Sequence, residues 1–82
     1  MTQEPTEKQM NFLRSLMTKG GKWIHGANVE MDRAAEEEFG YEKWDEAPLS
    51  RKVVSCVIDI YLGKADAGLY VWAVRRELEA AA

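Results

Sequence analysis

The first regular pattern of apolar positions lies near the start of the chain. Its members recur at helical spacing and are Met10, Phe12, Leu13, Leu16 and Met17. Thr6 and Gln9 stand at the spacing of a capping box, in which two side chains satisfy backbone N–H groups at a helix start. Gly20 and Gly21 favour a helix end, because glycine adopts left-handed backbone conformations easily. The pattern predicts a helix over residues 7–19.

A second helical pattern follows, with many acidic residues on its polar side. The apolar positions of this pattern are Met31, Ala34, Ala35 and Phe39. Asn28 is a suitable N-cap, and Gly40 is a suitable residue for the helix end. We therefore expect a helix over residues 29–39, with residues 22–28 as a connecting loop. Residues 41–44 are either a short turn of helix or a loop held by aromatic side chains.

The most apolar segment of the chain, residues 53–62, fits two patterns. Its apolar pairs repeat every four positions, as in a helix, whereas its alternating positions and β-branched residues favour a strand. No second segment is typical of a strand that could pair with it, so we predict a helix over residues 51–62, capped by Ser50. A fourth helix is predicted over residues 67–78, with Asp66 as its N-cap. The residues expected on its inner side are Leu69, Trp72 and Ala73.

Together these patterns predict an all-α fold, a compact bundle of about four short helices. A chain of 82 residues is long enough for one small domain, residues 1–82. No apolar run approaches the roughly 20 residues of a membrane helix, and the polar N-terminus is unlike a signal peptide. The one cysteine, Cys56, cannot form an internal disulfide, which is typical of a reducing cytoplasm. We expect a cytoplasmic protein that does not bind membranes.

Charge is distributed unevenly along the chain. The net charge is −3, and residues 26–50 contain eight carboxylates against two basic side chains. Both flanking parts of the chain are weakly basic. The negative total excludes a strongly basic nucleic-acid-binding tail. The acidic middle is typical either of a solvated helix face or of a surface that meets a basic partner.

No combination of residues in the sequence is typical of an enzyme. The single histidine, His25, and the single cysteine, Cys56, are 31 positions apart in unrelated segments. A metal site needs several converging ligands, and residues 20–22 lack the remaining spacing of a phosphate-binding loop. We therefore expect a protein that is not an enzyme and that uses no metal or other cofactor.

Two groups of residues are candidate binding surfaces. The first suits a protein partner, because aromatic side chains within a charged rim are typical of interface hot spots. Its members are Glu37, Glu38, Tyr41 and Trp44. The second suits nucleic acid, because basic side chains contact phosphates and an exposed indole stacks on bases. Its members are Lys19, Lys22, Trp23, Arg51 and Lys52.

We rank protein binding ahead of nucleic-acid binding, because the net charge of the chain is negative. A homodimer that buries the surplus aromatic side chains is a third alternative, since small helical chains often need such additional burial.

Two stretches resemble small paired-helix modules of bacteriophage and mobile-element proteins of DNA metabolism. The first is TEKQMNFLRSL, residues 6–16, and the second is LSRKVVSCVID, residues 49–59. The acidic segment between them is longer than the connection usual in such modules, and two valines stand where Glu-Ala is usual. The resemblance implies a non-catalytic accessory protein of phage origin in the host cytoplasm. It would bind a protein of the host or, alternatively, nucleic acid.

Overall fold

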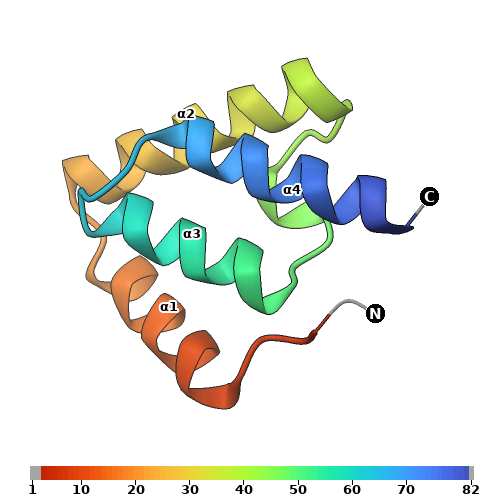
Figure 1. The fold of residues 1–82 in the computed structure, drawn as a ribbon. Helices are drawn as coiled ribbons and strands as arrows, with labels where there is room; N and C mark the ends of the chain where they lie inside the picture. Colours follow the sequence, from red (N-terminus) through yellow and green to blue (C-terminus); the bar gives the residue numbers. More distant parts are fainter. Residues whose placement is uncertain (1–2, 82) are drawn as a thin grey trace.

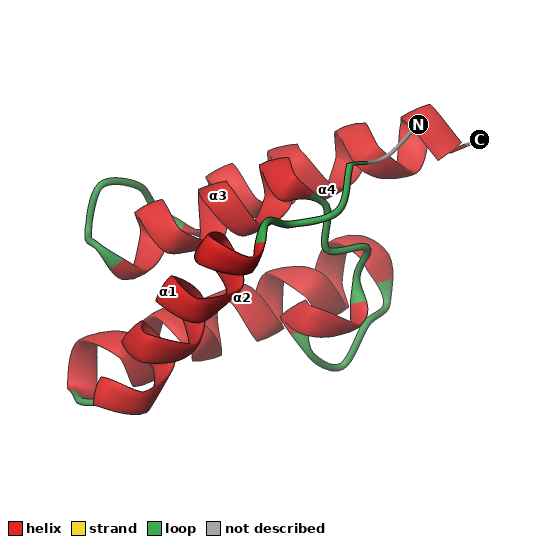
Figure 2. Cartoon of the chain, turned by 90° about the horizontal axis from the view of Figure 1, so that it is seen from below, coloured by secondary structure: helices red, strands yellow, loops and turns green. Residues whose placement is uncertain are grey.

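The computed structural model describes residues 3–81, and these residues form helices joined by short loops (Figure 2). No strand occurs within this part of the chain. Its elements are α1 (Glu7–Lys19), α2 (Lys22–Phe39), the 3₁₀ helix η1 (Trp44–Glu46), α3 (Arg51–Tyr61) and α4 (Ala67–Ala81). The predicted all-α bundle of about four helices is confirmed.

The central helix of the molecule is α3. It lies between α1 on one side and α2 and α4 on the other, and it packs against all three (Figure 1). Its buried residues are Val53, Val54, Cys56, Val57, Ile58, Ile60 and Tyr61. A helix with neighbours on several sides is apolar around most of its surface. This explains why the same segment also fitted a strand pattern.

Three helix starts are capped by the side chains that the sequence indicated. Thr6 Oγ1 accepts a hydrogen bond from the Gln9 N–H (3.1 Å), and Gln9 Oε1 accepts one from the Thr6 N–H (3.0 Å). Ser50 Oγ accepts from the Val53 N–H (3.2 Å), and Asp66 Oδ1 accepts from a backbone N–H in the first turn of α4 (2.9 Å). Each acceptor satisfies a donor that has no partner within its own helix.

The start of α2 differs from the prediction. This helix begins at Lys22, so the expectation of a loop over residues 22–28 is wrong. Gly20 and Gly21, both with positive φ, form the whole turn between α1 and α2. Ile24 is buried, so the inward stripe of α2 begins in the segment expected to be a loop. Asn28 lies inside the helix and does not cap it.

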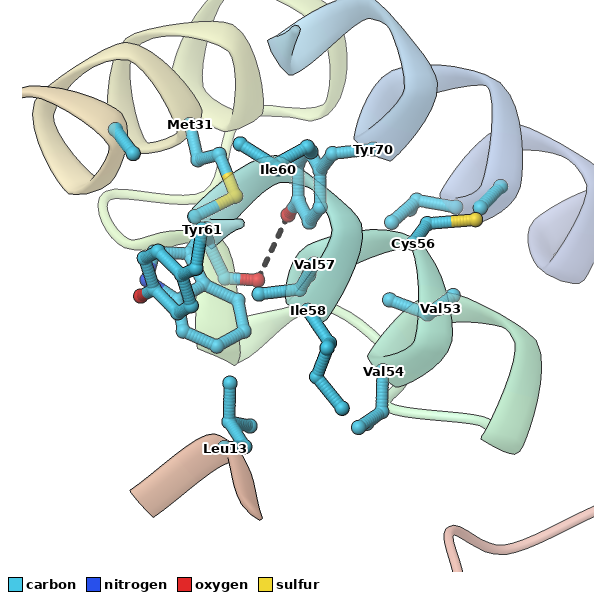
Figure 3. Packing of buried hydrophobic residues seen from close by; sticks show 14 of the residues in the cluster. Leu13, Met31, Val53, Val54, Cys56, Val57, Ile58, Ile60, Tyr61 and Tyr70 are labelled. Atoms are coloured by element: carbon cyan, nitrogen blue, oxygen red, sulfur yellow. Dashed lines mark hydrogen bonds between the residues drawn. The ribbon is translucent and has the colours of Figure 1, made fainter. Parts of the chain in front are cut away.

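The core contains an aromatic cluster around Trp44. Its indole lies edge-on to the rings of Tyr61 and Tyr70, with centroids 6.4 Å apart in both pairs. The Tyr70 hydroxyl donates a hydrogen bond to the Trp44 carbonyl oxygen (2.7 Å), the dashed line in Figure 3. Leu13 from α1 and Met31 from α2 point into the same core (Figure 3). Trp44 thereby fixes the segment between α2 and α3 to α2, α3 and α4.

The loops place the helix ends at two ends of the molecule. Because only residues 62–66 join α3 to α4, these helices run antiparallel (Figure 1). Gly63 of this loop lies against the ring of Trp23, which belongs to the first turn of α2. At the other end, the start of α3 and the last turns of α4 lie near Gln3. Within residues 3–81, no helix combines the length and the apolar character needed to cross a membrane.

Candidate binding surfaces

Trp44, one of the predicted protein-binding residues, belongs to the core. It is only 5% exposed. Its backbone N–H donates to Asp32 Oδ1 (2.8 Å), and its indole N–H donates to Asn28 Oδ1 (3.1 Å). The Tyr61 hydroxyl donates to the same Asn28 oxygen. The Trp44 ring offers no surface to a partner, which corrects its place in the predicted set.

The other three residues of that set lie along α2 or just after it. Glu37 is exposed. Glu38 Oε2 forms an ion pair with Arg75 Nη2 of α4 at 2.6 Å. Tyr41 is half-buried, with its ring centroid 6.2 Å from that of Phe39. Tyr41 therefore takes part in packing, whereas Glu37 and Glu38 are exposed and Glu38 is paired with Arg75.

The predicted nucleic-acid set is divided between the two ends of the molecule. Lys19 and Lys22 flank the turn between α1 and α2, and Trp23 follows in the first turn of α2. The Trp23 ring lies beside the C-terminal end of α3, whereas Arg51 and Lys52 begin that helix. An α-helix rises about 1.5 Å per residue, so the two subsets are separated by about 15 Å along α3. The structure does not join them into one site.

Trp23 is held in a fixed position although it is 64% exposed. Its indole N–H donates a hydrogen bond to the Tyr61 carbonyl oxygen (3.1 Å), in the last turn of α3. Carbonyls at that end of a helix lack donors within the helix, so the Trp23 indole supplies a donor to one of these carbonyls. Gly63 lies against the ring, since a Cβ atom at this position would be 3.6 Å from Trp23 Cζ2. The indole is thus anchored at its edge and open on much of its surface.

A small apolar hollow of about 160 Å³ opens beside Trp23. Its apolar part is formed by Ala27, Ile60 and Ala65. Gly26 leaves space in its wall, because no heavy atom lies within 4 Å of where its Cβ would be. Its charged lining residues, all exposed, are Lys22, Glu30 and Asp66. The hollow therefore combines an apolar interior with a mainly acidic rim.

The longer α2 joins this hollow to the acidic residues of the same helix. Seven residues make about two helical turns, so Trp23, Glu30 and Glu37 lie on one stripe of α2. We define the Trp23 surface as Trp23, the hollow at Gly26, Glu30 and Glu37. The sequence grouped Trp23 with the basic residues instead. The signal that could have corrected this was the helical spacing of Ile24 and Ala27 ahead of Met31.

Trp72 is on the outside of α4, so its predicted place in the core is wrong. It is 44% exposed. Lys52 Nζ and Arg76 Cζ lie 5.1 and 5.3 Å from its ring centroid. The buried residues of α4 are Tyr70, Ala73 and Val74. Spacings of three and four residues define this inner side, and a residue two positions after Tyr70 points away from it.

Groups suited to catalysis or metal binding are dispersed. Among residues 3–81, no three His, Cys, Asp or Glu side chains are placed to hold a metal ion. His25 is exposed on α2, whereas Cys56 is buried in α3. Burial raises the pKa of the Cys56 thiol, an effect that nearby Lys52 partly offsets. The thiol therefore stays protonated at neutral pH and contributes to packing.

Comparisons of the chain with models of known protein families, with curated proteins and with solved structures gave no match. The resemblance to paired-helix phage modules stays a prediction. The surfaces around Trp23 and Trp72 are the features from which a function can be inferred.

Proposed function

We propose that this chain is a non-catalytic cytoplasmic protein that binds a protein partner through the Trp23 surface. The observation that carries the proposal is an indole that is 64% exposed and yet fixed by a hydrogen bond to α3. A side chain already held in place loses little conformational entropy when a partner covers it. Tryptophan is also enriched among the residues that contribute most to binding energy at protein interfaces.

The lining of the hollow defines the chemistry of the partner. A volume of about 160 Å³ accommodates one apolar side chain, since an engineered cavity of similar size binds benzene. Glu30 and Asp66 lie around the hollow, and Glu37 follows on the same stripe of α2. These carboxylates favour lysine or arginine on the partner. We therefore infer a partner segment with one exposed apolar side chain flanked by basic residues.

Gly26→Leu tests this proposal with little risk to the fold. Position 26 is inside α2, its Cβ would meet no heavy atom within 4 Å, and leucine forms helices better than glycine. The new side chain would fill the hollow. A randomised peptide library panned against the full chain should yield peptides with an apolar residue between basic ones. By calorimetry, such a peptide should bind Gly26→Leu at least about tenfold more weakly.

Trp23→Ala should weaken the binding of the same peptide about 30-fold, which corresponds to a loss of about 2 kcal/mol of binding free energy, as for a hot-spot residue. Trp72→Ala is the matched control, because it removes an exposed indole that lies beside Lys52 at the start of α3, whereas Trp23 lies at the end of that helix. Circular dichroism of each variant checks that the helices are intact. A library without enriched peptides contradicts the proposal. Equal losses in Trp23→Ala and Trp72→Ala, or full affinity in Gly26→Leu, also contradict it.

A further inference from the structure

A second exposed indole, that of Trp72 on the outside of α4, has two cations close to its ring. Lys52 comes from the first turn of α3, and Arg76 comes one turn after Trp72 in α4. These helices lie side by side (Figure 1), so residues 24 positions apart in sequence meet at one ring. Lys52 Nζ is 5.1 Å and Arg76 Cζ is 5.3 Å from the centroid of that ring. Both distances are within the range of favourable cation–π contacts.

Arg51 extends the positive charge along the start of α3. Arg51 and Lys52 line two shallow hollows of about 430 and 400 Å³. At the N-terminal end of α3, the backbone N–H of Arg51 already has an acceptor, because it donates to the Gln3 carbonyl oxygen (2.7 Å). Ser50 Oγ accepts a further N–H of the first turn. The charge at this surface is therefore carried by the side chains of Arg51, Lys52 and Arg76.

This surface has a charge opposite to that of the molecule. The whole chain has a net charge of −3. Arg51, Lys52 and Arg76 contribute three positive charges here, and Glu77 is the acidic residue that lines the adjoining hollow. We call Arg51, Lys52, Trp72 and Arg76 the Trp72 patch. Its charge fits a polyanion, and its indole fits a flat apolar group.

We propose that the Trp72 patch binds single-stranded nucleic acid. Each nucleotide carries a phosphate and a flat base a short distance apart, as the patch carries cations and an indole. Arg51, Lys52 and Arg76 contact phosphates, while a base packs on the exposed part of Trp72. In a duplex the bases are stacked on one another and cannot reach this ring. A single strand can therefore contact both the cations and the indole of the Trp72 patch.

Fluorescence anisotropy of a labelled oligothymidylate, about 15 nucleotides long, tests the proposal with the full chain. The unmodified chain should bind at low salt, and Trp72→Ala should weaken binding about tenfold through loss of stacking. The double variant Lys52→Gln/Arg76→Gln should weaken binding further. It should also lower the slope of log affinity against log salt by about 1.4, since each single-strand phosphate contact contributes about 0.7.

Matched controls lie near the other end of α3, away from the Trp72 patch. Lys19→Gln/Lys22→Gln removes the same charge, and Trp23→Ala removes the other exposed indole. Neither should reduce the affinity more than about twofold, and circular dichroism checks folding. If Trp72→Ala does not fold, the comparison of Lys52→Gln/Arg76→Gln with Lys19→Gln/Lys22→Gln tests the proposal.

Three results would overturn the proposal. The first is no binding by the unmodified chain at about 20 mM salt, where electrostatic attraction is strong. The second is equal weakening in the two double variants, which would reflect only net charge. The third is a duplex of the same length that binds as tightly as the single strand, because then no base contact is involved.

Discussion

At the scale of single residues, one amide oxygen organises three elements of the fold. Asn28 Oδ1 in α2 accepts hydrogen bonds from the Trp44 indole (3.1 Å) and from the Tyr61 hydroxyl. Asp32, one turn later, accepts from the Trp44 backbone N–H (2.8 Å). Within residues 3–81, no buried side-chain nitrogen or oxygen lacks a hydrogen-bond partner. Aromatic rings with polar groups can therefore be buried here without an unpaired donor.

Asn28→Ala should destabilise the fold strongly. It leaves the Trp44 indole N–H and the Tyr61 O–H without their acceptor, and each unpaired buried group costs about 1–3 kcal/mol. We expect the free energy of unfolding, measured by urea denaturation, to fall by about 2 kcal/mol or more. The control is Asn11→Ala, an exposed position in α1, which should change it by less than about 0.5 kcal/mol. Equal effects in the two variants would disprove this role for Asn28.

At the scale of elements, α2 uses two glycines in opposite ways. Gly26 lies inside the helix, where glycine is less favourable than alanine. Gly40 follows the helix with φ 79°, in the left-handed region. Its N–H donates to the Glu36 carbonyl oxygen (3.0 Å), and the next N–H, of Tyr41, donates to the Ala35 carbonyl oxygen (3.2 Å). These bonds satisfy carbonyls that the end of α2 would otherwise leave free.

The same substitution should therefore have opposite effects at these two positions. Gly40→Ala should lower the free energy of unfolding by about 1 kcal/mol, because a Cβ atom is strained at positive φ. Gly26→Ala should raise it by about 0.5–1 kcal/mol, because alanine favours the helix and meets open space. Thermal unfolding of both variants beside the unmodified chain measures the two shifts. Shifts of the same sign would contradict the assignment of Gly40 as the helix end.

At the scale of the whole molecule, the assembled core keeps two phenols neutral. Tyr61 and Tyr70 are buried between helices, and burial is the main cause that raises the pKa of each hydroxyl. The nearby Asp32 carboxylate raises both further. The pKa of Tyr61 reaches about 12, compared with about 10 for an exposed tyrosine.

The fold should consequently lose stability in alkali. Above pH 10 the unfolded chain releases tyrosine protons that the folded chain retains, so unfolding becomes more favourable as the pH rises. The stabilisation of the fold by these protonated tyrosines is complete below pH 10. It is lost toward pH 12, by up to about 1.4 kcal/mol per pH unit for each buried tyrosine. Urea denaturation between about pH 8 and pH 11.5 measures the change, and Tyr70→Phe should show a shallower decline. Parallel declines for both proteins would show that Tyr70 stays outside this effect.

The starts of α1, α3 and α4 were the most predictable part of this molecule. The range of α1 follows from Thr6, Gln9 and Gly20, whose effects act over a few residues. The start of α2 did not follow from the sequence, because asparagine is a common N-cap residue and Asn28 was therefore expected to begin the helix. In the fold its oxygen is used by Trp44 and Tyr61, 16 and 33 positions away. Local patterns contain no information about such distant partners.

The sequence by itself determined the all-α class, the caps of α1, α3 and α4 and the apolar character of α3, because hydrophobic spacing and capping depend on neighbouring residues. Only the tertiary structure decided which indoles are exposed. Trp44 is buried by two tyrosines, whereas Trp23 and Trp72 remain open to solvent. It also decided that Lys52 and Arg76 meet at Trp72. The physical reason is that exposure depends on which faces the other helices cover, and packing across the whole chain fixes those faces.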